Sequence, residues 1–312
     1  MEQVIELCNK YHIQYSFENR MCHATGIGDI LFRLVCFNNN LINEPFYINL
    51  MYFTRPYYMT EPINQLEFRF LLINDILKYN NMKKDIIKFV FSNCYDIDQN
   101  MPYNLIENFN LKISHAGPPR QLGTLGVTPY TSPTIITIRD TVTDTVIDIN
   151  SNEYIIFHTK CRHYNGEDYG FLKDSIKTFC KNNKLKYKII IMGERVFPHT
   201  EEVDMHGITT VYNELLELKN NNVIIDISIE NIYNNLDYNN YISDIKIIEN
   251  AKYNICFGLG GQLCTSTIFG NSTIVYCNLS DILNTSNFKV NNFYCKTICE
   301  FFDLIKEKCG NE

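Results

Sequence analysis

Tryptophan is absent from this chain of 312 residues, and so is any run of about 18 consecutive apolar residues, so no membrane-spanning helix is expected. Basic residues are also scarce: 28 Lys and Arg stand against 35 Asp and Glu, which gives a net charge of −7. A nucleic-acid-binding protein would carry a basic surface, so we expect no nucleic-acid partner. The composition is that of a globular protein, and the chain is long enough for two domains.

The twelve cysteines are scattered, and no two of them form a CxxC pair. None of the seven histidines falls into an HExxH or zinc-finger spacing, so we expect neither a bound metal nor a cofactor. The first twenty residues lack the charged-then-apolar layout of a signal peptide. Reduced thiols and a cytoplasmic location are therefore the expectation.

The most informative stretch that is present runs from Lys252 to Asn278. The apolar run Tyr253–Phe257 predicts a buried strand, and the turn Gly258-Leu259-Gly260-Gly261 breaks it. A helix over 262–269 and a β-branched strand, Thr273–Tyr276, follow. A strand, a glycine turn and a helix form the unit in which parallel sheets present a helix N-terminus to an anion.

Several residues of this stretch are candidates for holding a phosphate group. Gly260, Gly261 and Gln262 form the turn and the helix start, where the backbone can approach a ligand closely. We expect Thr265 and Ser266 in the first helical turn, with their hydroxyls near a bound phosphate. An ordinary strand-to-helix turn explains the same residues, and the stretch alone leaves both interpretations open.

A second glycine turn lies near the start of the chain. Residues 21–24 could end a strand, residues 25–28 form a tight turn, and an amphipathic helix begins at Asp29. A carboxylate at a helix N-terminus is stabilised by the helix dipole, and taken alone this stretch favours a capping role. The alternative is a catalytic base, with Gly26 and Gly28 leaving room for a substrate.

Strands and helices alternate along the rest of the chain. The first part predicts helices over 2–11 and 66–79 and strands over 46–52 and 88–91. The second part predicts five strand units over 153–158, 187–192, 223–227, 253–257 and 273–276, with helices over 171–182, 211–218 and 241–250.

This alternation predicts an α/β protein of two Rossmann-like domains, residues 1–150 and 151–295, followed by a C-terminal helix within 296–312. The Gly- and Pro-rich region 113–133 is the expected linker or mobile loop, and an edge strand is expected within 134–149.

Charged residues follow two of the predicted strands. Lys160 and Arg162 come after the strand 153–158, and Gly193 and Glu194 come after the strand 187–192. Open parallel sheets bind ligands at the carboxyl ends of their strands, where an Arg fork and a Lys charge can hold a diphosphate. A solvated basic loop is the alternative. Asp96-Ile97-Asp98 matches a metal-binding DxD pattern, but that pattern is common by chance.

Three segments resemble the lipopolysaccharide heptosyltransferases of the GT-B glycosyltransferase superfamily. Gly26-Ile27-Gly28-Asp29 looks like their opening glycine-Asp turn, whose acid is the proposed general base. Ile190–Met192 with Gly193-Glu194 resembles their strand near the donor nucleotide, and Ala251–Val275 resembles their donor-diphosphate segment. The resemblance implies two Rossmann-like domains that face a central cleft.

The resemblance further implies a glycosyltransferase that moves a sugar from a nucleoside-diphosphate sugar to the hydroxyl of a glycan or other acceptor. Asp29 would take the acceptor proton. Lys160, Arg162 and the N–H groups after Gly260 would stabilise the leaving diphosphate without a metal. Glu230, or else Glu194, would bind the ribose.

The heptosyltransferases usually carry Asp and His around the late glycine turn, whereas this chain has Gly260-Gly261-Gln262, so a nucleotide sugar other than ADP-heptose is indicated. A nucleotide-sugar 2-epimerase and a catalytically silent GT-B-like binding protein remain alternatives. A NAD-dependent dehydrogenase is disfavoured because the glycines do not form GxGxxG. A homodimer is compatible with the sequence and is not required by it.

Overall fold

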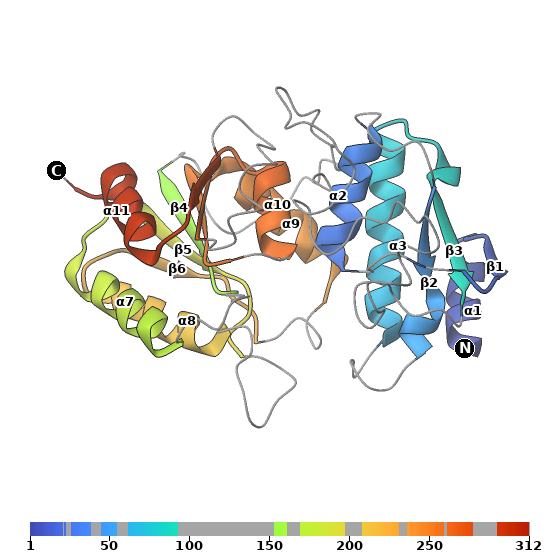
Figure 1. Cartoon of the computed structure of the whole chain (residues 1–312), viewed down its shortest axis with the longest axis horizontal. Helices are drawn as coiled ribbons and strands as arrows, with labels where there is room; N and C mark the ends of the chain where they lie inside the picture. The colour runs from blue at the N-terminus through green and yellow to red at the C-terminus, as the bar shows by residue number, and fades with distance from the viewer. Residues whose placement is uncertain are drawn as a thin grey trace, which may run out of the picture. The chain divides into compact units, whose positions relative to one another are not determined.

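The computed structural model describes residues 1–20, 22, 26–38, 45–54, 62–92, 153–160, 169–196, 208–230, 236–258, 261–276 and 292–311 (Figure 1). The chain divides into two compact units. One contains the described residues up to 92 together with Leu236–Ile242. The other contains the described residues of 153–230 and of the chain from Ser243 onward.

The first unit is built on a parallel sheet whose strands lie in the order β1-β3-β2. Its strands and longer helices are, in chain order, α1 (Glu2–Lys10), β1 (Tyr15–Phe17), α2 (Ile27–Asn38), β2 (Phe46–Asn49), α3 (Pro62–Tyr79) and β3 (Ile87–Phe91). Four of the five residues of the central strand β3 are buried; these four are apolar, and the exposed one is Lys88.

Two boundaries in this unit differ from the prediction. The strand before α2 is Tyr15–Phe17, earlier in the chain than residues 21–24, and the described Cys22 lies outside it. The strand β2 ends at Asn49 because the side-chain oxygen of Asn49 accepts a hydrogen bond from the backbone N–H of Met51 at 2.9 Å. This local turn directs the chain into the 3-10 helix Leu50–Thr54 instead of continuing the strand.

The second unit contains a parallel sheet of six described strands in the order β6-β5-β4-β7-β8-β9. Its strands are β4 (Tyr154–His158), β5 (Lys188–Met192), β6 (Ile224–Asp226), β7 (Tyr253–Cys256), β8 (Thr273–Tyr276) and β9 (Asn292–Cys295). Its α-helices are α7 (Tyr169–Asn182), α8 (Ile208–Leu215), α10 (Gly261–Phe269) and α11 (Ile298–Cys309), together with α9 (Tyr238–Asn250) from Ser243 onward. When these six strands are numbered 1 to 6 along the chain, their spatial order in the sheet is 3-2-1-4-5-6, which is the doubly wound Rossmann arrangement.

The prediction of a mixed α/β protein with parallel sheets is confirmed. Five of the six strands of the second unit were predicted, and β9 was missed. The side chains of Asn292, Phe293 and Tyr294 are only half-buried, so this edge strand lacks the continuous apolar run by which buried parallel strands are recognised.

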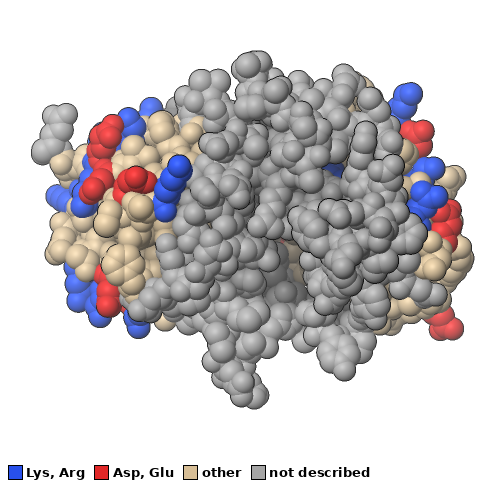
Figure 2. All heavy atoms as spheres, in the orientation of Figure 1, with Lys and Arg blue, Asp and Glu red and all other residues tan. Residues whose placement is uncertain are grey.

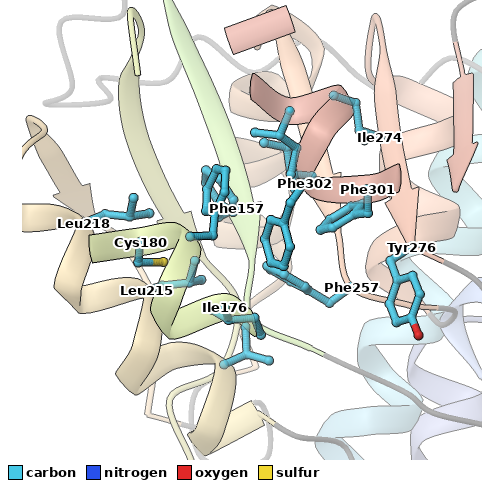
Figure 3. Packing of buried hydrophobic residues seen from close by; sticks show 14 of the residues in the cluster. Phe157, Ile176, Cys180, Leu215, Leu218, Phe257, Ile274, Tyr276, Phe301 and Phe302 are labelled. Carbon is cyan, nitrogen blue, oxygen red and sulfur yellow. The ribbon is translucent and has the colours of Figure 1, made fainter. Parts of the chain in front are cut away.

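The core on one face of this sheet contains a group of aromatic rings among more numerous aliphatic side chains. Figure 3 shows Phe157, Phe257, Phe301 and Phe302 among the buried residues of this cluster. The ring centroids of Phe257 and Phe301 lie 5.3 Å apart, and those of Phe179 and Phe302 lie 4.6 Å apart. The helix α11 therefore belongs to the core of the second unit.

Local capping sets the start of α11. The hydroxyl of Thr297 accepts a hydrogen bond from the backbone N–H of Glu300, and the carboxylate of Glu300 accepts one from the backbone N–H of Thr297. This capping box begins the helix at Ile298, two residues after the predicted start.

None of the described helices is long and apolar enough to cross a membrane. On the face shown in Figure 2, the acidic and basic side chains of the described residues are interspersed.

We expect the substitution Phe301→Ala to lower the free energy of unfolding of the second unit by roughly 3–5 kcal/mol, because the ring is fully buried and leaves a cavity. Urea denaturation followed by circular dichroism measures this loss. The matched control is Phe171→Ala on α7, where the ring is 55% exposed and a change within about 0.5 kcal/mol is expected. Equal losses in the two variants would contradict this description of the core.

Candidate functional site

The strand order of the second unit reverses between β4 and β7, which lie side by side at the centre of the sheet. Phe157 of β4 is in register with Ile255 of β7, so the two strands end next to each other. In open parallel sheets, ligands bind beyond the carboxyl ends of the strands at such a reversal. This edge of the sheet, beyond the carboxyl ends of β4, β5, β6 and β7, is here named the ligand edge.

The helix α10 begins at the ligand edge. After β7, Gly258 has a φ of 155°, a backbone conformation that residues with a side chain rarely adopt. The helix starts at Gly261, where the N–H groups of its first turn have no partner within the helix and carry the positive end of its dipole. This start can hold an anion. Gly260 lies outside the described residues, as does the side chain of Gln262.

The predicted position of Thr265 and Ser266 in the first helical turn is wrong. Because α10 begins one residue earlier than predicted, both residues lie in its second turn. Their exposed fractions are 4% and 0%. The hydroxyl of Ser266 hydrogen-bonds Nε2 of His158 at 2.9 Å, inside the second unit. A part for these residues in binding the donor stays a prediction.

Lys160 stands two residues beyond β4 at the ligand edge and is half-buried. The preceding residue, Thr159, still belongs to the ladder, since its backbone N–H donates to the carbonyl of Met192 at 3.0 Å. The sequence-predicted partner of Lys160, Arg162, lies outside the described residues.

The loops after β5 and β6 pair with each other. Glu194 forms a parallel bridge with Ile229, and the backbone N–H of Val196 donates to the carbonyl of Glu230 at 3.0 Å. Gly193 has a φ of 119°, which allows the chain to turn after β5. The structure thus brings Glu194, which is buried, and Glu230, which is exposed, to neighbouring positions of the ligand edge.

A hydrogen-bonded network that the sequence analysis missed supports these two loops. Arg195 donates from Nε to the hydroxyl of Ser228 at 2.9 Å and from Nη2 to its carbonyl at 2.8 Å. Oδ1 of Asp226 accepts from the backbone N–H of Ser228 at 3.0 Å, and Oδ2 accepts from the hydroxyl of Tyr212 at 2.9 Å. The Asp226-x-Ser228 spacing, typical of a local side-chain turn, was the available signal.

This network also sets the charge of Asp226. Burial alone would raise the pKa of its carboxyl group, but the hydrogen bonds from Ser228 and Tyr212 and the charge of Arg195 lower the pKa below its ordinary value. Asp226 is therefore a carboxylate that orders the loops rather than a proton donor.

His158, the last residue of β4, is the second feature that the sequence analysis did not assign to the site. Its side chain is 1% exposed, and burial lowers its pKa to about 4, against which the neighbouring Asn254 has a smaller raising effect. Asn254 is a polar residue inside the buried strand β7, and such an interruption of an apolar run was the available signal.

In the first unit, the helix α2 begins at Ile27, two residues earlier than predicted. The carbonyl of Gly26 accepts a hydrogen bond from the backbone N–H of Ile30 at 3.0 Å, so Gly26 is the capping residue. Asp29 is the third residue of the helix, which confirms its place in the first turn. Gly26 is exposed and Gly28 is buried, and the side chain of Asp29 lies outside the described residues.

Among the described residues, no group of three or more His, Cys, Asp or Glu side chains could hold a metal ion. The Asp96-Ile97-Asp98 stretch lies outside them. A surface groove of about 540 Å³ runs between α7 and α11 and includes Phe171, Asp174, Cys299 and Lys306 in its lining. None of the candidate residues lines this groove.

No protein-family model and no curated protein sequence matches this chain. A comparison with solved structures finds a likeness to E. coli heptosyltransferase WaaC with ADP-2-deoxy-2-fluoro heptose, at 10% sequence identity and a TM-score of 0.36. The match covers 94% of this chain and 98% of the other. A TM-score of this size supports no conclusion about the activity of this chain.

The buried His158 predicts a loss of stability in acid. Its folded-state pKa of about 4 lies below the value of about 6.5 in an unfolded chain, so the unfolded state takes up a proton first. The free energy of unfolding should therefore fall as the pH drops from about 6.5 to about 4. The full loss from this residue is roughly 3 kcal/mol.

Urea titrations of the wild type and of His158→Gln between pH 7 and pH 4 measure this effect as the difference between their pH dependences. The comparison is needed because burial raises the pKa of Asp244 to about 7, which acts in the opposite direction. The thiol of Cys256 has a pKa raised by burial to about 12 and does not titrate in this range. If the free energy of unfolding depended on pH in the same way in both proteins, His158 would not be the source of this loss of stability.

Proposed function

We propose that this protein is a glycosyltransferase that transfers a sugar from a nucleoside-diphosphate sugar to an acceptor hydroxyl. One observation carries the proposal. Four separate stretches chosen from the sequence as donor-binding, at Lys160, Gly193-Glu194, Glu230 and Gly261, all follow the carboxyl ends of adjacent strands of one parallel sheet. Such an edge, at the reversal of strand order, is where doubly wound sheets bind nucleotides.

The diphosphate is assigned to the start of α10. The backbone N–H groups from Gly261 onward present positive partial charge, and Gly258 lets the chain turn there without a side chain in the way. Lys160, two residues beyond β4, and Arg162, two residues further along the chain, would add two full charges. Together these groups would stabilise the negative charge that builds up on the leaving diphosphate, so the proposed reaction needs no metal ion.

The ribose is assigned to Glu230, with Glu194 as the second choice. A carboxylate accepts hydrogen bonds from a pair of hydroxyls, and both acids stand on loops that the network of Arg195, Asp226 and Ser228 holds in place. The exposure of Glu230 leaves its side chain accessible to a ligand, whereas Glu194 is 8% exposed.

Asp29 is proposed as the general base that takes the proton of the acceptor hydroxyl. Gly26 and Gly28 beside it leave room for an acceptor at the start of α2. A general base must come within hydrogen-bond reach of the acceptor hydroxyl whose proton it takes.

A thermal-shift screen of the purified protein against UDP-, GDP-, dTDP-, ADP- and CMP-sugars, each with and without Mg²⁺, tests this function. A ligand that binds the folded state raises the melting temperature by mass action. We expect a shift with one nucleotide family that is equal with and without Mg²⁺. No shift with any of the five would count against the donor site. Conversion of the bound donor without an acceptor would indicate the 2-epimerase instead.

We expect the double substitution Lys160→Ala with Arg162→Ala to weaken binding of that nucleotide sugar at least tenfold, because two charges beside the diphosphate are lost. Isothermal titration calorimetry measures the change. The matched control is Lys188→Ala with Lys252→Ala, two exposed lysines at the amino ends of β5 and β7 and hence at the opposite edge of the sheet. If the two double variants bound the nucleotide sugar with equal affinity, Lys160 and Arg162 would have no part in binding it.

We expect Asp29→Asn to leave donor affinity unchanged and to reduce turnover by about a hundredfold or more, as the loss of a general base does. Asp237→Asn is the control: Asp237 also stands at a helix start, where its carboxylate accepts from the backbone N–H groups of Asn239 and Asn240 at 2.7 and 3.0 Å. The control should keep its turnover. If Asp29→Asn lowered only the melting temperature, Asp29 would have a capping role alone.

A further inference from the structure

Buried polar side chains connect α10 to the centre of the sheet. His158 of β4, Asn254 and Cys256 of β7 and Ser266 of α10 are each at most 2% exposed. The register between β4 and β7 places the side chains of His158, Asn254 and Cys256 on the same face of the sheet, opposite to the aromatic core. Polar groups buried this deeply are costly unless they are hydrogen-bonded, so their partners and proton positions are strongly constrained.

A backbone carbonyl fixes one end of this chain of groups. Nδ2 of Asn254 donates to the carbonyl oxygen of Ile248 at 3.2 Å. A carbonyl can only accept, so the amide cannot be turned around without bringing two oxygen atoms together. Oδ1 of Asn254 therefore faces away from Ile248 and is itself only an acceptor.

The ring of His158 is the group that complements this acceptor. Nδ1 of His158 and Oδ1 of Asn254 are both buried, and neither has a hydrogen-bond partner among the described residues. The Asn254 side chain raises the pKa of the ring, which is the effect of an acceptor that faces a ring N–H. A hydrogen on Nδ1 would allow the ring to donate to Oδ1 of Asn254, whereas a bare Nδ1 would set two acceptors against each other.

The tautomer also decides the role of Nε2, the other ring nitrogen of His158. The ring is neutral at pH 7, so a hydrogen on Nδ1 leaves Nε2 as an acceptor, and the hydroxyl of Ser266 must donate across the 2.9 Å contact. The donors therefore point one way, from Ser266 through His158 to Asn254 and Ile248.

We propose that His158 is a positioning residue whose ring, protonated on Nδ1, ties α10 to β4 and β7 and thereby sets where the start of α10 stands at the ligand edge. The importance of this position for a bound diphosphate rests on the proposed function, whereas the tautomer and the tie to the helix do not.

The packing around the C-terminal end of α10 leaves little freedom to shift the helix. A Cβ atom at Gly270 would come within 2.5 Å of both Nδ2 of Asn254 and the carbonyl oxygen of Ser266. The same carbonyl accepts a hydrogen bond from the hydroxyl of Thr273 at 3.2 Å. The C-terminal end of α10 is thus held in place beside Asn254 and Thr273.

The tautomer is tested on the wild-type protein, labelled with ¹⁵N, by long-range ¹H–¹⁵N correlation of the histidine rings at pH 7. The signal of His158 is assigned by its disappearance in His158→Gln. We expect a neutral ring that carries its hydrogen on Nδ1. A neutral ring with its hydrogen on Nε2, or a doubly protonated ring, would overturn the proposal.

The tie to the helix is tested by amide hydrogen exchange of α10 in Ser266→Ala. Loss of one hydrogen bond should speed exchange of the α10 amides about tenfold. The control is Thr267→Val: its hydroxyl is also buried, but it bonds the carbonyl of Leu263 within α10 itself at 2.9 Å. Exchange in the control should match the wild type. Unchanged exchange in Ser266→Ala, or an equal increase in both variants, would overturn the positioning role.

These measurements separate the inference from the proposed function. If none of the UDP-, GDP-, dTDP-, ADP- and CMP-sugars binds, the proposed function is wrong. The tautomer and the exchange rates still decide the role of His158 in that case. If a nucleotide binds, its affinity should drop in Ser266→Ala and not in Thr267→Val. Equal affinity in the two variants would show that the tie does not position the binding site.

Discussion

Parallel pairing of β4 with β5 on one side and β7 on the other is the constraint on which the second unit depends. All five residues of β4 are buried, so this strand must be covered on both faces. Parallel strands need long crossover connections, and these supply the helices that cover the sheet. Because the pairing is parallel, the carboxyl ends of these strands lie at one edge of the sheet, where residues far apart in the sequence become neighbours. The candidate site is thus a consequence of strand direction.

Two polar groupings support this edge, and both connect parts of the chain that are distant in sequence. On the β5–β6 side, Arg195 and Asp226 are joined through Ser228, so the charges are compensated and the loops that carry the two glutamates are ordered. At the reversal, His158 and Ser266 connect the sheet to α10 without any charge, since burial keeps the imidazole neutral. A partly exposed network can contain ions, whereas a fully buried one is built from neutral groups because desolvation penalises charge.

The two helices assigned to the reaction begin in similar ways. The start of α2 follows Gly26 and that of α10 follows a turn containing Gly258, and each leaves first-turn N–H groups that favour negative charge. In one helix the sequence supplies the negative charge itself, as Asp29. In the other the first residues are neutral, so an anionic ligand can take that place. The two helix starts thus differ in whether the chain itself supplies the negative charge. This difference is the physical basis for proposing that the general base lies on α2 and that the diphosphate binds at the start of α10.

The sequence alone predicted the alternation of strands and helices and the positions of polar residues after strands, because apolar periodicity and glycine turns are local signals. It placed β8 at Thr273–Tyr276, as observed, and erred at the helix starts near Ile27 and Gly261 by one or two residues. Three features could not be predicted from the sequence and are seen only in the folded protein: the strand order, the partners of His158 and the network around Asp226. These depend on which strands pair and which faces are covered, and the residues that meet there, such as His158 and Ser266, are separated by more than a hundred positions in the chain.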